Sequence, residues 1–376
     1  MKRTLAALLC VSALLTPAAL AAAPQVEAAA AVLMEKETGT VLCEQNAHDK
    51  REPASVTKIM TLLLVMEALD EGRMALTDPV TVSAHAASMG GSQVYLKEGE
   101  QMSVEELIKA VAVVSGNDAA VALAEHIAGS EEAFVERMNQ KAAQLGMADT
   151  TFVNCTGLPA AGHLTSAYDI ALMSRALILN HPDIRQYSTI WMDTIRGGQF
   201  QLANTNKLVR YYEGCTGLKT GSTDSALYCL SATAEREGME LIAVVLGSST
   251  SAQRFDAAQA LLTYGFANYT LVDVRPGQAI PPVAVSLGVT DSVQPVLENG
   301  SRILVEKALL NQITTELRLT EGVEAPVEQG QKLGELVVSA GDTQLQTIPL
   351  VAHQAVERIT VPGLFLRLVR TLFLAG

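Results

Sequence analysis

The stretch Pro53-Ala54-Ser55-Val56-Thr57-Lys58 runs directly into residues 59–65, Ile-Met-Thr-Leu-Leu-Leu-Val, which are apolar except for the threonine. No helix breaker follows before Gly72. This pattern predicts a helix that begins at or just before Ser55 and carries Lys58 one turn later on the same face. A serine hydroxyl is a weak nucleophile without an adjacent base, and Lys58 is placed to take its proton. It can do so only if its pKa is lowered by burial or by a second cation. A helix cap followed by a solvated lysine is the alternative reading.

The residues before Ser55 predict a β-hairpin. Residues 31–34 and 40–43 are short apolar runs, and the polar residues 35–39 between them favour a turn. Glu52 and Pro53 then end the extended structure. Ser55 is therefore predicted at a junction between strand and helix, where backbone amides of the first helical turn can face developing negative charge.

A second polar turn is predicted between two apolar helices. Ser103 is a candidate N-cap, and the apolar residues of 107–114 continue the helix that it begins. Ser115-Gly116-Asn117 interrupts that run before another apolar helix over residues 119–127. Glycine breaks the helix there, so that the two polar side chains can point into a cleft. An ordinary turn between helices is the alternative.

A third motif, Lys219-Thr220-Gly221, lies in a hairpin predicted over residues 214–232. Residues 241–247 predict a further, fully apolar strand. With helices predicted around 131–145 and 168–179, these strands indicate an α+β fold, an antiparallel sheet packed with helices. An edge strand with this motif can pair with an extended substrate, because glycine allows close approach and lysine and threonine supply donors to a carboxylate.

Length and composition describe a globular protein of more than one domain. The chain has 376 residues, 49% hydrophobic and 18% charged, which suggests two or three domains. A net charge of -13 without clustered Lys and Arg argues against a nucleic-acid partner. The histidines are scattered and no cysteines form close pairs, so no metal and no cofactor is implied. We expect free thiols at the cysteines Cys43, Cys155, Cys215 and Cys229.

The N-terminus is typical of a secretory signal. Lys2 and Arg3 precede an apolar core over about residues 5–15, and small residues follow up to Ala23. Residues 1–23 are therefore predicted to be a signal peptide, with the position of cleavage left open. The sequence thus predicts that the protein is exported.

The three motifs Ser-x-x-Lys, Ser-x-Asn and Lys-Thr-Gly occur in the order found in penicillin-binding proteins and β-lactamases. Residues 31–269 resemble the low-molecular-mass penicillin-binding proteins of the D-alanyl-D-alanine carboxypeptidase family, and the sequence Asn-Thr-Asn-Lys-Leu at 204–208 adds to the match. The resemblance implies a catalytic domain with the serine β-lactamase/penicillin-binding-protein-like fold over residues 31–271. It implies neither a metal nor a cofactor.

The resemblance also implies a role for each motif residue. In the chemical steps, Ser55 is the acylated nucleophile, Lys58 its base and Ser115 a proton relay. Substrate binding falls to Asn117, which contacts an amide of the substrate, to Arg254, which binds its terminal carboxylate, and to the edge strand with Lys219, Thr220 and Gly221. The backbone amides of Ser55 and Ser222 stabilise the oxyanion. Two lysines converging on Ser55 should lower each other's pKa, so that Lys58 is neutral while Lys219 stays charged.

The function implied is that of a D-Ala-D-Ala carboxypeptidase at the outer face of the cytoplasmic membrane. Such an enzyme removes the terminal D-alanine of peptidoglycan stem peptides through an acyl-serine intermediate and binds β-lactam antibiotics. A serine β-lactamase is one alternative, weakened because no glutamate for deacylation occurs between Glu136 and Glu213. A catalytically idle wall-binding protein is another, since Ser222 and Leu227 depart from the family pattern.

The last hundred residues differ in character from the rest. Prolines at 276, 281 and 282 precede short alternating apolar runs, which predict a β-rich domain over residues 272–356. Residues 359–376 predict an amphipathic helix that is too short to span a bilayer but suits a membrane surface, with packing on the β-rich domain as the alternative. Its predicted apolar face carries Phe365, Leu368, Val369 and Leu372, and its opposite face Arg367 and Arg370.

Overall fold

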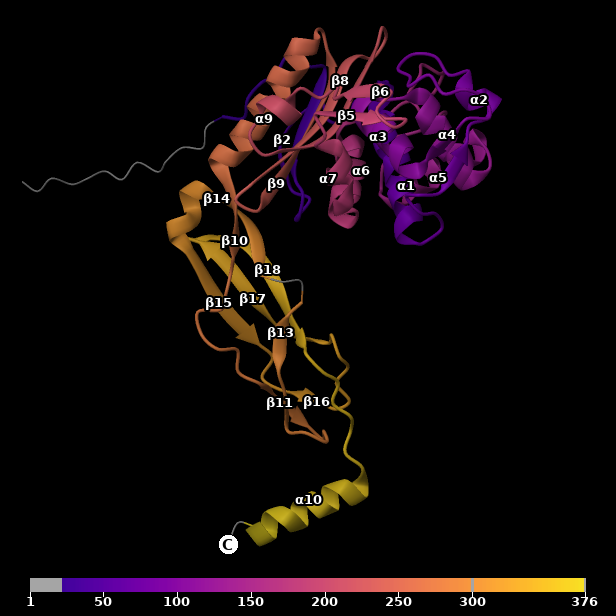
Figure 1. Ribbon diagram of the computed structural model, residues 1–376. Coiled ribbons are helices and arrows are strands. Elements are labelled where there is room, and N and C mark those ends of the chain that lie inside the picture. Colours follow the sequence, from indigo (N-terminus) through magenta and orange to yellow (C-terminus); the bar gives the residue numbers. More distant parts are fainter. Residues whose placement is uncertain (1–21, 299–300, 375–376) are drawn as a thin grey trace, which may run out of the picture.

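A computed structural model describes residues 22–298 and 301–374, with side chains up to Arg370. Figure 1 shows a broad N-terminal domain, a narrower β-rich domain that extends from it, and a helix, α10, at the far end. The signal peptide predicted for residues 1–23 falls, except for its last two positions, outside the described residues.

A five-stranded antiparallel sheet lies at the centre of the N-terminal domain, with strand order β2-β1-β9-β8-β7. Its strands are β1 (Ala30–Glu35), β2 (Val41–Gln45), β7 (Cys215–Thr223), β8 (Leu227–Arg236) and β9 (Met239–Ser248). The two predicted hairpins and the apolar strand β9 are confirmed. β7 lies at an edge of the sheet, as predicted for the strand that carries Lys219-Thr220-Gly221.

Helices cover both faces of this sheet. Leu33 of β1 packs in a cluster with α9 (Ser251–Asn268), whereas its neighbour Val32 packs in the larger core on the opposite face, where α6 (Ala167–Asn180) lies. Successive side chains of a strand point to opposite faces, so both must be apolar when both faces are covered. This explains the unbroken apolar sequence of the central strands.

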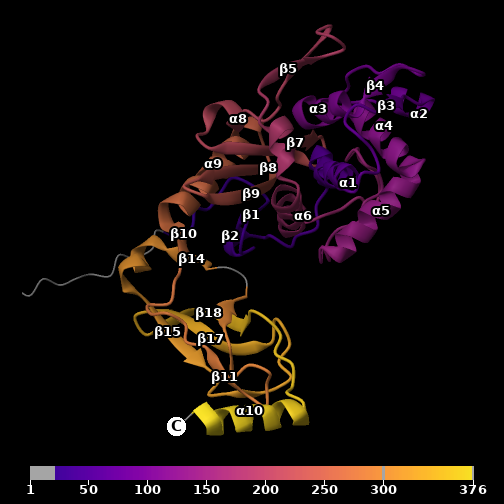
Figure 2. The same cartoon turned by 60° about the horizontal axis from the view of Figure 1, so that its bottom comes forward.

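The helical part of this domain surrounds α1 (Lys58–Asp70), which follows the short 3-10 helix η1 (Ala54–Thr57). Ten of the thirteen residues of α1 are buried, as expected of a helix that is apolar all round. It contacts α6 and the helices α3 (Val104–Val114), α4 (Asn117–Ala128) and α5 (Glu131–Gln144) (Figure 2). The helices predicted from the sequence are confirmed within a few residues.

Several short elements lie outside the helices and strands predicted above. Residues 79–103 contain two paired strands and a helix, and residues 182–211 contain a small hairpin and short helices. These elements are β3 (Pro79–Thr81), α2 (Ala84–Ala87), β4 (Gln101–Ser103), η2 (Pro182–Ile184), α7 (Arg185–Ser188), β5 (Met192–Ile195), β6 (Phe200–Ala203) and α8 (Leu208–Tyr211). Each has at most four residues, too few for a periodic pattern to reveal.

The C-terminal domain is β-rich, as predicted, and has two small apolar cores. Its elements are β10 (Tyr269–Asp273), β11 (Val283–Ser286), β12 (Ser292–Val293), β13 (Pro295–Leu297), β14 (Arg302–Glu306), η3 (Lys307–Gln312), β15 (Ile313–Leu319), β16 (Val323–Glu324), β17 (Lys332–Ala340) and β18 (Thr343–Ala352). β10 continues from α9 and pairs with β14, so the boundary predicted between residues 271 and 272 falls inside a strand.

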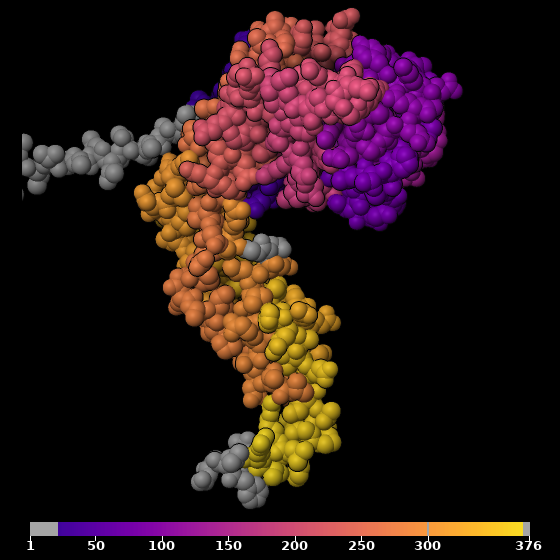
Figure 3. Space-filling view, viewed as in Figure 1, coloured from indigo at the N-terminus to yellow at the C-terminus, as the bar shows by residue number. Residues whose placement is uncertain are grey.

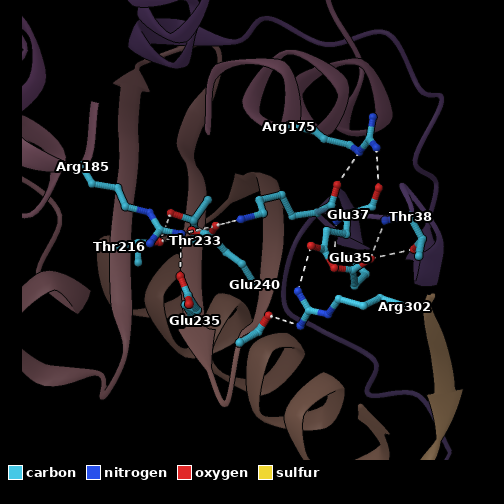
Figure 4. A network of polar contacts seen from close by, with 12 residues as sticks. Glu35, Glu37, Thr38, Arg175, Arg185, Thr216, Thr233, Glu235, Glu240 and Arg302 are labelled. Carbon is cyan, nitrogen blue, oxygen red and sulfur yellow. Dashed lines mark hydrogen bonds and ion pairs between the residues drawn. The ribbon is translucent and has the colours of Figure 1, made fainter. Parts of the chain in front are cut away.

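Arg302 of β14 connects the two domains. Its Nη1 lies 2.9 Å from Oε1 of Glu37, in the turn after β1, and its Nη2 donates to the carbonyl oxygen of Gly238 at 2.9 Å. Figure 4 shows that this turn is held from its other side by Arg175, which donates to the carbonyl of Glu37 at 2.7 Å. The β-rich domain thus meets a braced turn and extends away from the larger domain (Figure 3).

Helix α10 (Val361–Leu374) lies at the end of the β-rich domain remote from the sheet of the N-terminal domain (Figure 1). Arg367 binds Asp291 at 2.6 Å and the carbonyl of Val289 at 2.9 Å, so the helix does contact its own domain. Phe365 and Leu368, on the predicted apolar face, are 66% and 56% exposed. No helix within residues 22–298 and 301–374 is long and apolar enough to cross a membrane.

Candidate active site

Ser55 and Lys58 are brought together by the short helix η1. Ser55 lies within its single turn, and Lys58 is the first residue of α1. In a 3-10 helix, side chains three residues apart eclipse each other, which aligns this pair more closely than an α-helix does. Oγ of Ser55 lies 2.9 Å from Nζ of Lys58. The predicted adjacency of hydroxyl and amine is therefore present, and Lys58 is fully buried rather than solvated.

The other two contacts of Lys58 determine which way its amine points. Nζ lies 2.6 Å from Oδ1 of Asn117 and 2.7 Å from the carbonyl oxygen of Thr156. The orientation of the Asn117 side chain is fixed by its other end, where Nδ2 donates a hydrogen bond to the carbonyl oxygen of Gly90 at 2.6 Å. Because a carbonyl oxygen can only accept, Oδ1 is the atom that faces Lys58. Both oxygens at Lys58 are thus acceptors. A neutral amine has two N–H groups and one lone pair, so its lone pair remains for the Ser55 hydroxyl.

Burial governs the protonation of both lysines at the site. It lowers the pKa of Lys58 to about 7, against smaller opposing effects of Cys155 and Asp118. Burial also lowers the pKa of Lys219 well below its usual value, and the charges of Lys58 and Arg254 lower it further. Desolvation by burial is therefore the largest cause of the lowered pKa at both amines.

Ser115 ends α3 in a strained conformation next to Asn117. Its φ of +66° lies in the left-handed region, which a residue with a side chain seldom adopts. The backbone nitrogen of Asn117 donates to the carbonyl oxygen of Ser92 at 2.7 Å, which fixes the start of α4. Oγ of Ser115 is buried and has no hydrogen-bond partner within the described part of the chain. A hydroxyl held in this way is available to a substrate.

Strand β7 passes directly beside the turn of Ser55. A Cβ built on Gly221 would lie 2.9 Å from the backbone nitrogens of both Ser55 and Val56, closer than real Cβ atoms approach. Only glycine allows this approach of strand and turn. Thr220 on the same strand bonds Thr205 through their hydroxyl oxygens at 2.7 Å, and Nζ of Lys219 donates to the carbonyl of Thr220 at 3.0 Å.

Arg254 of α9 contacts the backbone of β7. From α9 its Nη1 donates to the carbonyl of Gly221 at 3.0 Å, and its guanidinium lies over the rings of Tyr228 and Phe255. It is buried, and burial lowers the pKa of Arg254. In this structure Arg254 therefore supports the backbone of β7. Ser222, the next residue of the strand, is exposed.

Leu227, the other departure from the family pattern, starts β8 opposite Thr223. Its φ of +58° is in the left-handed region and its side chain is 41% exposed. A glycine at this position would adopt that conformation without steric cost.

His163 is buried beside the short helix η1 that carries Ser55. Its Nδ1 accepts from the Val153 amide at 3.0 Å, so the proton of the neutral ring is on Nε2, which lies 2.8 Å from Oγ1 of Thr57. Burial lowers the pKa of His163 to about 4.

Sequence reasoning missed three contacts of the site. Thr205 belongs to a matched motif but was given no role, and Thr156 acts through its carbonyl, for which a sequence holds no side-chain signal. Asn154 shapes the loop that carries Thr156. Across residues 22–298 and 301–374, no group of His, Cys, Asp and Glu is arranged to hold a metal. The four cysteines Cys43, Cys155, Cys215 and Cys229 are free.

A Ser–Lys pair beside a Lys-Thr-Gly edge strand, in a sheet covered by helices, defines the penicillin-binding class of active-serine proteins. The family model "D-alanyl-D-alanine carboxypeptidase" matches residues 18–250, and that of the C-terminal domain of penicillin-binding protein 5 matches residues 274–358. The chain belongs to the D-alanyl-D-alanine carboxypeptidase family. The fold class and the resemblance inferred from the motifs are thereby confirmed.

Individual relatives agree. The D-alanyl-D-alanine carboxypeptidase DacF of Bacillus subtilis is 41% identical over 337 residues, 88% of this chain and 86% of DacF. DacC of Escherichia coli is 36% identical over 344 residues, 89% of this chain and 86% of DacC. The crystal structure of penicillin binding protein 5 from Haemophilus influenzae matches with a TM-score of 0.81 and 32% identity, covering 89% of this chain and 99% of that one.

A structure with a bound antibiotic is also similar. Penicillin-Binding Protein D2 from Listeria monocytogenes in its ampicillin-bound form matches with a TM-score of 0.59 and 34% identity, covering 64% of this chain and 98% of that one. The alternatives of a β-lactamase and of an idle wall-binding protein gain no support from these comparisons.

Proposed function

We propose that this protein is an exported serine-type carboxypeptidase that removes the terminal D-alanine from peptidoglycan stem peptides ending in D-Ala-D-Ala. The observation that carries this proposal is the contact of 2.9 Å between Lys58 Nζ and Ser55 Oγ, with the two other contacts of Nζ made to oxygens that only accept. The family of the chain supports the substrate.

In the acylation step, the Ser55 hydroxyl attacks the carbonyl carbon of the penultimate D-alanine while Lys58 takes its proton. Electrons move onto the carbonyl oxygen, which the backbone amides of Ser55 and Ser222 stabilise. The bond to the terminal D-alanine then breaks. Its nitrogen receives a proton by way of Ser115, whose unpartnered hydroxyl suits a relay. The products are an ester on Ser55 and free D-alanine.

Deacylation reverses these roles. A water molecule loses its proton to Lys58 and attacks the ester, which restores Ser55 and releases the shortened peptide. The substrate lies along the edge strand β7, with Asn117 on its amide and Thr220 and Lys219 near its terminal carboxylate. The role that we assign to Gly221 is to let β7 lie close to the turn that carries Ser55. Arg254 acts on the carboxylate through the strand that it supports, since it contacts the Gly221 carbonyl.

The experiment measures D-alanine released from a peptide ending in D-Ala-D-Ala, and the mass of the protein after exposure to penicillin. We expect release by the wild type and a mass increase of one penicillin per chain. Ser55→Ala should abolish both. Release or a covalent adduct in Ser55→Ala would show that another residue is acylated. Ampicillin bound to the Listeria relative supports β-lactams as ligands here.

We also propose where the enzyme works. The signal peptide at residues 1–23 sends it across the cytoplasmic membrane, the catalytic domain comprises residues 31–271, and the β-rich domain over 272–356 spaces it from the membrane surface. Residues 359–376 lie on that surface, supported by the exposure of Phe365 and Leu368.

The test of this placement compares vesicles containing anionic lipid with neutral vesicles. We expect the full mature chain to bind the anionic vesicles and a chain ending at residue 358 to remain in solution. Phe365→Ser with Leu368→Ser should weaken binding without loss of carboxypeptidase activity. Equal binding by the full and shortened chains would exclude the helix as the anchor.

A further inference from the structure

The loop over residues 154–158 is built around the side chain of one residue, Asn154. Its Oδ1 accepts from the amides of Thr156 at 3.1 Å and Gly157 at 2.7 Å, and also from the Thr156 hydroxyl at 3.1 Å. Its Nδ2 donates to the carbonyl oxygen of Leu158 at 2.9 Å. One amide therefore sets the path of the whole turn, including the direction of the Thr156 carbonyl.

At Gly157 the same loop packs closely against η1 (Ala54–Thr57), the turn that carries the nucleophile Ser55. A Cβ there would lie 1.8 Å from the carbonyl oxygen of Ala54 and 2.8 Å from Oγ1 of Thr57, and the φ of Gly157 is +82°. The loop can lie this close only with glycine at that position. Thr156 is consequently fixed between its own turn and η1, and its carbonyl oxygen stays 2.7 Å from Nζ of Lys58.

We propose that Asn154 is a positioning residue of the Ser55–Lys58 pair, which holds the Thr156 carbonyl so that it engages one N–H of Lys58 and directs the lone pair to Ser55. This inference rests on the proposed function and deepens it. The Asn154 side chain makes its hydrogen bonds within its own loop and not to Ser55 or Lys58, so it acts through the peptide group of Thr156.

Two consequences follow from the chemistry of the amine. If the Thr156 carbonyl moves away, Asn117 is the one remaining acceptor for the N–H groups of Lys58. The Lys58 amine can then rotate so that an N–H, and not its lone pair, points toward Ser55. The carbonyl dipole also favours the charged ammonium, so its loss should lower the pKa of Lys58 further. Of the other ionisable groups near this amine, Asp118 and Lys219 lie outside the loop. Cys155 follows Asn154 in the chain, but its backbone nitrogen is held separately, by Oε1 of Glu131 at 3.0 Å.

The test uses Asn154→Ala with Asn139→Ala as its matched control. Asn139, on α5, holds the same segment two residues earlier, since its amide exchanges hydrogen bonds with Phe152 N and O, both at 2.9 Å. It has no contact with Lys58. Asn154→Ala removes four hydrogen bonds from the segment and Asn139→Ala removes two, and only Asn154→Ala releases the Thr156 carbonyl.

We expect Asn154→Ala to be acylated by penicillin roughly 100-fold more slowly than the wild type, the scale for a misplaced reacting group. The acid limb of its rate profile should move to lower pH, and KM for the peptide should change little. Asn139→Ala should keep the wild-type rate within a few-fold and the wild-type acid limb. Asn154→Asp retains the oxygen acceptor and should recover part of the rate.

Thermal unfolding of each variant is measured alongside. If Asn154→Ala does not fold, the comparison of Asn154→Asp with Asn139→Asp carries the test, with an altered acid limb expected in the former alone. A wild type that penicillin does not acylate would overturn the proposed function and this inference with it. A reactive wild type with matching rates and acid limbs in the 154 and 139 variants would overturn the inference alone.

Discussion

Gly221 leaves no room for a side chain beside Ser55, since a Cβ on it would lie 2.9 Å from the Ser55 backbone nitrogen. This nitrogen is one of the two amides to which we assign the oxyanion. The edge strand β7 and the turn that carries Ser55 thus enclose a narrow space. Its width depends on the absence of a side chain at Gly221.

Gly221→Ala should therefore impair catalysis. The added methyl group pushes β7 away from the turn or covers the amide, and the loss of one oxyanion donor costs roughly 100-fold in rate. The rate of penicillin acylation measures the effect. Gly277→Ala is the control, because its Cβ would meet nothing closer than 3.9 Å, and it should match the wild type. If Gly221→Ala were acylated by penicillin at the wild-type rate, the role assigned to Gly221 would be contradicted.

The rate of acylation should rise with pH through about 7, because Lys58 accepts a proton only when neutral and burial lowers its pKa to about 7. Below that pH the amine is charged and the rate should fall tenfold per pH unit. Lys58→Arg keeps a cation that stays protonated, so it should react roughly 1000-fold more slowly at pH 8. A pH profile of penicillin acylation checks both statements. An acid limb near pH 10 would show a solvated lysine.

The motif residues were predictable because each combines a side-chain type with a spacing. Ser55 and Lys58 lie on one helical turn, Ser115 and Asn117 flank a glycine, and Lys219 precedes a threonine and a glycine in a predicted hairpin. The contacts between those motifs were not predictable. The Thr156 carbonyl reaches Lys58 across 98 residues of sequence, and a backbone oxygen leaves no trace in residue identity.

The cause of the lowered pKa at Lys58 and Lys219 was not predictable either, for a related reason. A sequence shows how many charges converge on a site but not how deeply each is buried, and burial has the largest effect on the pKa of both amines. Arg254 is a similar case. Its type suits a carboxylate, yet only the fold shows that its guanidinium faces the Gly221 carbonyl.

His163 should make folding stability depend on pH in the acid range. Burial lowers its pKa from 6.5 to about 4, so between these values the unfolded chain binds a proton that the folded chain does not. The contribution is complete above pH 6.5 and decreases as pH falls, by about 3 kcal/mol near pH 4. His163→Gln should lose stability less steeply over this interval in urea unfolding. Parallel curves for both proteins would contradict this role.

Leu227→Gly should stabilise the protein. The φ of +58° costs a leucine about 1 kcal/mol or more, and glycine adopts it freely, against a smaller loss from greater freedom of the unfolded chain. We expect the free energy of unfolding to rise by roughly 0.5–1 kcal/mol. Leu310→Gly is the control, a leucine of similar exposure in η3 without positive φ, and should lower stability. Equal losses in both variants would show that Leu227 is unstrained.

Thr205→Val should weaken substrate binding more than it slows chemistry. Thr205 and Thr220 share a hydrogen bond of 2.7 Å between their hydroxyl oxygens, and this bond restricts the rotation of the Thr220 hydroxyl that we place near the substrate carboxylate. Valine keeps the shape but not the bond, whose loss is worth about 1 kcal/mol, or roughly a fivefold rise in KM. Steady-state release of D-alanine separates KM from kcat, and Thr205→Ser should retain the wild-type KM. A rise in KM of the same size in the serine variant would instead point to the lost methyl group, and Thr205 would then act through packing.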